Sequence, residues 1–221
     1  MIAPPDRSAA TAADALGAAA YPLAVHVLRA RGGLVFAPPR RQTIESALGR
    51  VMRRMGVLDA AQFAAALAEP GPVFDEVMSL VTVGETYFFR EPSQFAFLRD
   101  HVLRECCERR ERSPRPVRMW SAACATGEEA YSLAITALEA HVPSVVIGTD
   151  VARARLAAAR RGRYREWSMR GVPRDVIDRY FTRVDNEYSI AADLRRDLRF
   201  LYLNLTSDRY PAAFGDAGAF D

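Results

Sequence analysis

One turn, at residues 119–132, constrains the fold of this chain more than any other stretch. Its sequence is M-W-S-A-A-C-A-T-G-E-E-A-Y-S, in which an apolar run leads in, small residues with one glycine follow, and two glutamates come next. This order predicts a strand, a tight loop and a helix, with a loop backbone that can approach a small molecule closely. Everything after the turn therefore has to be compatible with an open α/β sheet.

The pattern of strands and helices continues beyond this turn. Residues 144–149 are apolar and end in Asp150, an Ala- and Arg-rich helix follows, and residues 199–203 alternate before Asn204 and Leu205. Strands that alternate with helices indicate an α/β domain with a parallel sheet. Three strands bury the two faces of such a sheet poorly, so we expect an incomplete domain whose remaining strands lie beyond Asp221.

The first half of the chain has helical spacing instead. Apolar residues recur at helical intervals over 40–55 and 74–83, and Gly56 and Asp59 are placed to end one helix and cap the next. We expect four parts, namely a flexible Ala-rich tail at 1–20, a helical domain at 21–107, a charged Pro-containing linker at 108–116, and the α/β domain at 117–221.

Composition excludes several classes of protein. Half of the 221 residues are hydrophobic, which is typical of a globular chain, and the net charge is only +3. No stretch approaches the ~20 apolar residues that span a bilayer, so we expect no membrane insertion. Cys106, Cys107 and Cys124 lack the spacing of zinc ligands. Three cysteines without a signal peptide indicate reduced thiols, a cytoplasmic protein and no metal.

The turn and Asp150 together indicate an adenosyl ligand. A helix N-terminus favours an anionic group, whereas Glu128 and Glu129 favour a cationic one, so an amino-acid moiety satisfies both. Asp150 follows the turn at the distance where a carboxylate accepts the two hydroxyls of a ribose. The alternatives are that the glutamates only complement the helix dipole and that Asp150 only caps the next helix.

Two further segments carry candidate residues. Residues 82–92 read T-V-G-E-T-Y-F-F-R-E-P, with three aromatics before Arg90. A buried Arg90 requires a carboxylate partner, which a cofactor or a substrate glutamate can provide, whereas the aromatics alone are typical of a core. Asn204 at the end of a strand can bind an adenine edge or simply form a turn.

Four segments, in this order, resemble the CheR-type chemotaxis receptor methyltransferases. They are T-V-G-E-T-Y-F-F-R-E-P, W-S-A-A-C-A-T-G-E-E-A-Y-S, G-T-D-V with the following A-R-R-G-R-Y, and F-L-Y-L-N-L. The resemblance covers residues 21–221. It implies a small N-terminal helical domain joined to a Rossmann-like, S-adenosylmethionine-dependent methyltransferase domain, and O-methylation of glutamate side chains on receptor signalling helices.

The resemblance also implies a set of site residues. Thr86 and Arg90 lie at the cofactor pocket, with Arg90 also expected to orient the substrate carboxylate. The other expected cofactor-binding residues are Gly127, Glu128 and Glu129 at the methionine end, Asp150 at the ribose, and Asn204 and Leu205 beside the adenine. Which of the two glutamates makes the contact is left open. The family often has asparagine at the position of Gly84.

A partner surface and two other function classes follow from the remaining residues. On the helix at 40–55, four arginines lie off the apolar stripe and either dock acidic receptor helices or form a solvated face: Arg41, Arg50, Arg53 and Arg54. One alternative function is a non-catalytic signalling module that binds S-adenosylmethionine or S-adenosylhomocysteine. The other is a nucleic-acid methyltransferase, but no N-P-P-Y motif is present, so we expect no nucleic-acid partner.

Overall fold

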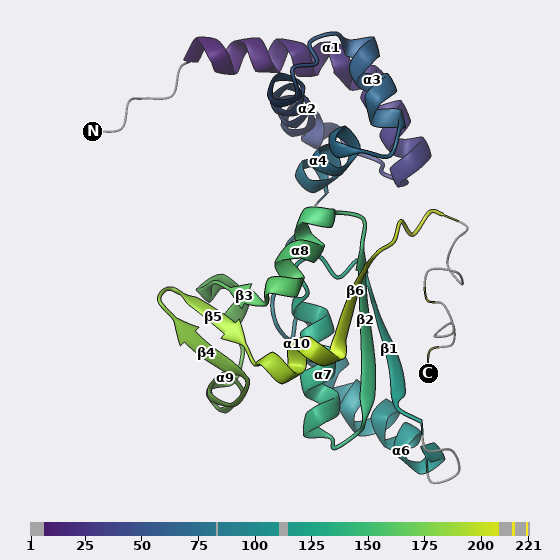
Figure 1. The fold of residues 1–221 in the computed structure, drawn as a ribbon, viewed down its shortest axis with the longest axis vertical. Helices are drawn as coiled ribbons and strands as arrows, with labels where there is room; N and C mark the ends of the chain where they lie inside the picture. The colour runs from purple at the N-terminus through teal and green to yellow at the C-terminus, as the bar shows by residue number, and fades with distance from the viewer. Residues whose placement is uncertain (1–6, 83, 111–114, 208–213, 215–219, 221) are drawn as a thin grey trace. The chain divides into compact units, whose positions relative to one another are not determined.

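The structure, a computed structural model, describes residues 7–82, 84–110, 115–207, 214 and 220. The chain divides into two compact units, residues 1–83 and 84–221 (Figure 1). This boundary differs from the expected one near residue 107. Leu103 and Cys106 pack into the same core as Val117 and Met119 of the sheet, so the helices before the charged linker belong to the second unit.

The first unit is helical, as expected. Its elements are α1 (Arg7–Gly32), the 3-10 turn η1 (Pro38–Arg40), α2 (Arg41–Met55), α3 (Ala60–Ala68) and α4 (Pro72–Val81). The apolar stripe of α2 is buried, since Ile44, Leu48 and Val51 have no exposed surface. Gly56 ends α2 in the left-handed conformation, and Asp59 accepts the Gln62 N–H at 2.8 Å as the N-cap of α3.

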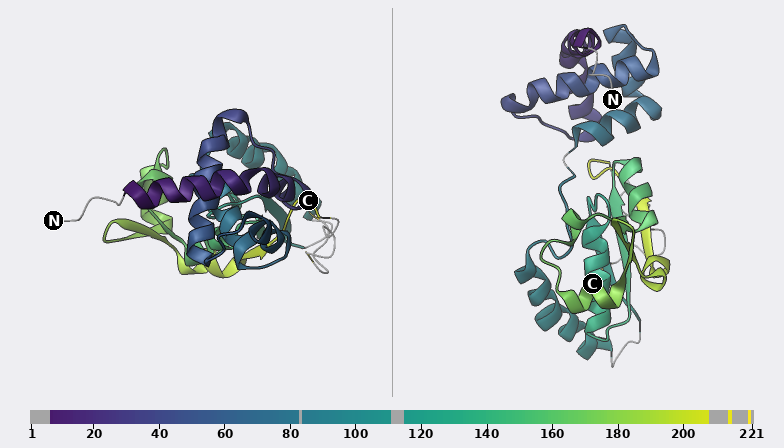
Figure 2. Two further views of the ribbon diagram at one scale, coloured as in Figure 1. Left: turned by 90° about the horizontal axis from the view of Figure 1, so that it is seen from above. Right: turned by 90° about the vertical axis from the view of Figure 1, so that its left-hand side faces the viewer.

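Helix α1 corrects the expected tail at residues 1–20. The helix already begins at Arg7, and its face with Gly17, Ala20 and Ala24 is buried where α1 lies across α2 (Figure 2). At Gly17 the two backbones approach so closely that an added Cβ would lie 1.8 Å from the carbonyl oxygen of Glu45. Small residues thus produce the packing, and residues 1–6 lie outside the described part.

The second unit contains the three parallel strands that the sequence predicts. They are β1 (Val117–Ala122), β2 (Ser144–Asp150) and β6 (Leu198–Tyr202), in the order β1-β2-β6. Helix α7 (Glu128–Glu139) follows β1, and α8 (Arg153–Arg161) follows β2. Adjacent parallel strands that are each followed by a helix are typical of a Rossmann-like sheet, and the α/β fold class is confirmed.

Smaller elements surround this sheet. A second, antiparallel sheet has the order β3-β5-β4, formed by β3 (Arg163–Tyr164), β5 (Glu187–Ile190) and β4 (Phe181–Val184). The remaining helical elements are α5 (Pro92–Phe97), the π-helical turn η2 (Leu98–Leu103), α6 (Arg104–Arg110), the 3-10 turn η3 (Glu166–Met169), α9 (Arg174–Tyr180) and α10 (Ala192–Asp197). No helix among the described residues is both long and apolar enough to cross a membrane.

The two faces of the parallel sheet carry separate apolar cores. On one face Val146 and Phe200 pack with Tyr131 of α7 and Leu156 of α8. On the other, Ile147 packs with Leu203 and Phe214, and Trp120 and Phe220 lie against them. Neighbouring residues of a strand, such as Val146 and Ile147, thus belong to opposite cores, as in a sheet that is covered on both sides.

Candidate functional site

The strand register brings the candidate segments to one edge of the parallel sheet. Ala122 at the end of β1 is paired with Thr149, and Asp150 at the end of β2 is paired with Tyr202 of β6. The loops that follow these strands therefore start side by side. In open α/β sheets this carboxyl edge is where ligands bind.

The loop between β1 and α7 has an unusual backbone. Ala123, Ala125 and Gly127 have φ values of 60°, 48° and 93°, so three of five residues lie in the left-handed region. Alanine adopts this region at a cost, and such residues concentrate at ligand sites. The Cys124 N–H donates to the Thr149 carbonyl at 2.8 Å, which fixes the loop to β2.

Asp150 fastens the two neighbouring loops to each other. One oxygen accepts the Ala125 N–H at 2.9 Å and the other accepts the Ala152 N–H at 2.8 Å, and the residue is 5% exposed. Because Ala152 is the residue before α8, this bond fixes the approach to the helix, and it does not itself cap the first turn. A carboxylate has about four acceptor positions, so the two backbone donors leave capacity for the two hydroxyls of a ribose.

The two glutamates at the start of α7 have different surroundings. Glu128 is 2% exposed and accepts the hydroxyls of Thr126 and Ser168, at 2.6 Å and 2.9 Å. Burial raises the pKa of Glu128 above its ordinary value, and the two hydroxyls only partly oppose this. Glu129 is exposed and accepts the Ser121 hydroxyl at 2.6 Å, at the end of β1. Glu129 is therefore the glutamate that a ligand can reach.

The segment at residues 84–91 is fixed to this edge by its aromatic residues. Phe88 is buried edge-to-face against Tyr164, with ring centroids 4.8 Å apart, so the core role expected for the aromatics holds for this one. Its N–H donates to the Ser168 carbonyl at 3.0 Å. The Phe89 N–H donates to the hydroxyl of Ser132 in α7 at 2.9 Å. The segment is thereby held against both α7 and η3.

Arg90 is exposed, which differs from the expected buried guanidinium with a carboxylate partner. It donates to the carbonyl of Glu85 at 2.9 Å and lies 6.0 Å from the ring centre of Tyr87. The residues on each side, Phe89 and Glu91, have φ values of 54° and 62°. Two strained neighbours present Arg90 to solvent, while Thr86 is half-buried in the same segment.

Asn204 and Leu205 follow β6 at the same edge. The side-chain oxygen of Asn204 accepts the N–H and the hydroxyl of Thr206, at 3.1 Å and 2.9 Å, so Asn204 does form the turn that was the alternative to adenine binding. Leu205 is 39% exposed. The Leu203 N–H donates to the Asp150 carbonyl at 3.2 Å, which holds this turn beside the proposed ribose position.

Several residues at this edge were not anticipated. An added Cβ at Gly84 would lie 2.5 Å from Cζ of Arg155, so the Arg155 guanidinium fills the space of a side chain there. Burial lowers the pKa of Arg155, and nearby Asp150 opposes the shift. Ser168 and Arg170 join the site through η3. No local sequence signal identifies them, because the residues they contact are distant in the chain.

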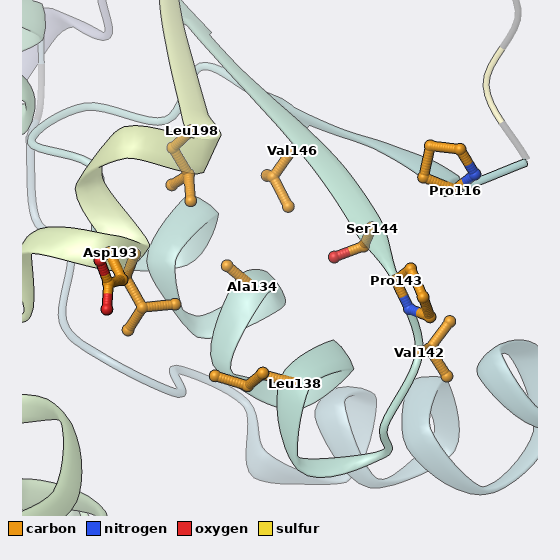
Figure 3. A pocket seen from close by; sticks show the side chains of 10 residues that line it. Pro116, Ala134, Leu138, Val142, Pro143, Ser144, Val146, Asp193 and Leu198 are labelled. Atoms are coloured by element: carbon orange, nitrogen blue, oxygen red, sulfur yellow. The ribbon is translucent and has the colours of Figure 1, made fainter.

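The described residues contain no group of three or more His, Cys, Asp or Glu that could hold a metal ion. A cavity of about 460 Å³ lies between α7, the start of β2 and α10, and is largely apolar, with Leu138, Val146 and Leu198 in its wall (Figure 3). It lies where the parallel strands begin, which is the opposite edge from the candidate site.

Comparisons with known proteins agree with this geometry. Residues 84–216 match the family model described as "CheR methyltransferase, SAM binding domain". Chemotaxis protein methyltransferase 2 of Vibrio cholerae is 34% identical over 144 residues, which is 62% of this chain and 49% of that protein. A probable chemotaxis protein methyltransferase of Rhizobium etli is 31% identical over 78% of this chain and 68% of its own length. The chemotaxis protein methyltransferase of Escherichia coli is 29% identical over 81% and 64%. The chain thus spans about half to two thirds of the length of these relatives.

Proposed function

The chain belongs to the CheR methyltransferase family, and we propose that it transfers the methyl group of S-adenosylmethionine to glutamate side chains of a chemotaxis receptor in the cytoplasm. The observation that carries this proposal is the strained loop at residues 123–127, which Asp150 holds at the carboxyl edge of the sheet. Ala123 in this loop is exposed, whereas Cys124, Ala125 and Gly127 are buried, and acidic side chains lie on both sides of the loop.

The donors and acceptors at this edge fit the groups of the cofactor. Asp150 has acceptor capacity for the ribose hydroxyls. Exposed Glu129 suits the ammonium group, and Arg90 suits the carboxylate, because guanidinium pairs well with that group. We assign Thr86 and the loop at Gly127 to the methionine end, and Asn204 and Leu205 to the adenine. Glu128 is assigned to holding the loop rather than to contacting the cofactor.

The reaction needs little acid–base chemistry from the protein. When bound, S-adenosylmethionine supplies an electrophilic methyl group on a positively charged sulfur. A glutamate substrate is already ionised at neutral pH, since its reference pKa is ~4.3. The residues at this edge therefore contribute binding, alignment and the exclusion of water, which can account for much of a rate enhancement.

Cofactor binding is tested by calorimetric titration with S-adenosylhomocysteine. We expect Asp150→Ala and Glu129→Gln each to weaken binding about tenfold or more, because each removes an ionised hydrogen-bond partner. Asp178→Ala is the matched control, since Asp178 lies exposed on α9 and pairs with Arg174. Equal affinity of the Glu129→Gln variant and the wild type would contradict the assignment of Glu129.

Methyl transfer is tested with radiolabelled S-adenosylmethionine and receptor membranes. Label on receptor glutamates, removed by mild base as expected for a methyl ester, supports the proposed activity. Tight S-adenosylhomocysteine binding without any transfer would instead indicate the non-catalytic signalling module. A steep salt dependence of nucleic-acid binding would point to the third function class.

We also propose that α2 provides the docking surface for acidic receptor helices. Arg50, Arg53 and Arg54 are exposed on the side of α2 away from the apolar stripe, and Arg41 is exposed at the start of the helix. Arg41 pairs with Glu45 at 2.7 Å, and Arg54 pairs with Glu76. Charged residues at the rim of an interface mainly raise the rate of association, and this effect decreases as the salt concentration rises.

The docking proposal has a direct test. Changing Arg50, Arg53 and Arg54 together to glutamate should weaken binding of a receptor signalling-helix peptide in calorimetry. The control triple carries the same charge change on exposed arginines of the second unit, namely Arg104, Arg109 and Arg183. Equal affinities of the two triple variants would contradict a docking role for α2.

A further inference from the structure

Arg170 lies between two aromatic rings beside the candidate site. Its Cζ atom is 3.7 Å from the ring centre of Tyr87 and 3.7 Å from that of Trp167. Its guanidinium also lies 3.3 Å from a carboxylate oxygen of Glu85. We call Arg170, Tyr87, Trp167 and Glu85 the Arg170 clamp.

The clamp is connected on one side to a proposed cofactor residue and on the other to Glu128, which holds the loop at residues 123–127. Tyr87 follows Thr86 directly in the segment that presents Arg90. Ser168 lies between Trp167 and Arg170, and its hydroxyl donates to Glu128 at the start of α7 at 2.9 Å. The clamp therefore stands at the methionine end of the proposed site, where a substrate glutamate has to approach the methyl group.

The two kinds of contact in the clamp differ in strength. A guanidinium held between two rings has a fixed plane, and the N–H groups at its edge remain suited to a carboxylate. The side chain of Arg170 is 29% exposed, and that of Glu85 is 58% exposed. An ion pair this exposed contributes little, because solvent screens it. Arg170 is thus an ordered cation whose carboxylate partner is easily displaced.

We propose that Arg170 binds the carboxylate of the substrate glutamate, and that Glu85 occupies this position until the substrate arrives. Glu85 bears the same functional group as the substrate, so its pairing already displays the recognition chemistry. Exposed Trp167, at 64%, offers an apolar surface beside that carboxylate for the rest of the substrate helix. This inference rests on the proposed glutamate methylation and names the residue that recognises its substrate.

The clamp can also be explained as a purely structural contact that fixes the segment at residues 84–91 to η3. The two explanations differ for Glu85→Gln. If Glu85 competes with the substrate, the variant should lower the KM for a receptor substrate about two- to fivefold, as expected for an exposed ion pair. If the clamp is only structural, the loss of the pair should leave the KM unchanged or raise it.

Arg170→Gln provides the complementary variant. We expect it to raise the KM for the receptor substrate about tenfold or more while the Kd for S-adenosylhomocysteine stays unchanged, because it removes a charge-assisted hydrogen-bond donor for the substrate alone. Arg170→Lys should lie between Arg170→Gln and the wild type, since it keeps the charge and loses the planar fork. Arg174→Gln, an exposed arginine on α9 paired with Asp178, is the control.

The outcomes separate this inference from the proposed function. A wild type that binds no S-adenosylhomocysteine or methylates no glutamate would contradict the proposed function itself. An active wild type together with an unchanged or raised KM in Glu85→Gln would overturn the role of the clamp alone. Should Arg170→Gln fail to fold, as judged by thermal melting, the Glu85→Gln measurement still decides.

Discussion

Gly17 offers a sharp test of how the N-terminal helix packs. Gly17 is buried in α1, and an alanine Cβ there would lie 1.8 Å from the Glu45 carbonyl oxygen and 2.6 Å from its carbon. Both atoms belong to the backbone of α2, so no side-chain rotation relieves the contact. The substitution Gly17→Ala therefore requires α1 to move away from α2.

The size of the effect follows from two opposing contributions. Alanine is favoured over glycine in a helix interior by ~1 kcal/mol. Overpacking costs ~1–3 kcal/mol in general, and here the shift also exposes the buried face with Ala20, Ala24 and Leu28. We expect a net destabilisation of about 1–3 kcal/mol. For a unit of this size that lowers Tm by roughly 4–8 °C per kcal/mol.

Circular dichroism melting of the wild type, Gly17→Ala and an exposed control measures this change. The control is Ala18→Gly, next in sequence and exposed, which should cost only ~0.5–1 kcal/mol through helix propensity. A flexible tail would behave differently, because there alanine would leave the Tm unchanged or raise it slightly. An unchanged or raised Tm for Gly17→Ala would refute the packing of α1 on α2.

Two further predictions concern buried groups at the site. Burial raises the pKa of Glu128, so the folded protein keeps this proton to a higher pH than the unfolded chain. The stability contributed by Glu128 is therefore present below its unfolded pKa and is lost as pH rises through the folded pKa. Glu128→Gln should remove that loss in urea unfolding measured from about pH 4 to 8, and an identical pH slope in the variant and the wild type would contradict it. Burial, with the nearby carboxylates of Asp150 and Glu129, also raises the pKa of the Cys124 thiol to about 12. Cys124 should therefore resist alkylation at pH 8 until the protein unfolds, and prompt labelling of the native protein, read by mass spectrometry, would show that this environment is wrong.

The elements that the sequence predicts well are those with local physical causes. Apolar residues at helical spacing predict α2 and its buried face, and Gly56 and Asp59 end and cap helices through contacts within one turn. The three parallel strands are short, mainly apolar segments, although β1 and β6 each contain an arginine. Each of these signals lies within a few residues of the feature that it specifies, so a single sequence is sufficient to read it.

The features that the sequence does not predict depend on contacts between distant segments whose local patterns are weak. In the part of α1 before residue 21, the buried residues among those described are Gly17 and Ala20, which carry little hydrophobic signal, so this segment resembles a solvated tail. Strand β3 is only two residues long and is defined by its pairing with β5. The boundary between the units is set by Leu103 and Cys106, whose partners lie beyond the charged linker.

The paired glutamates show where prediction of the site stops and why. Adjacent residues on a helix point about 100° apart, so Glu128 and Glu129 cannot share one environment. Sequence places both at the ligand edge, but the choice between them depends on Ser168, forty residues away, whose hydroxyl binds Glu128 and draws it inward. Once Glu128 is buried with Thr126 and Ser168, it stabilises the loop and η3 together. Glu129, which accepts the Ser121 hydroxyl, keeps an exposed carboxylate at the end of β1. We therefore propose that one glutamate shapes the site and that the other binds the single ammonium group of the ligand.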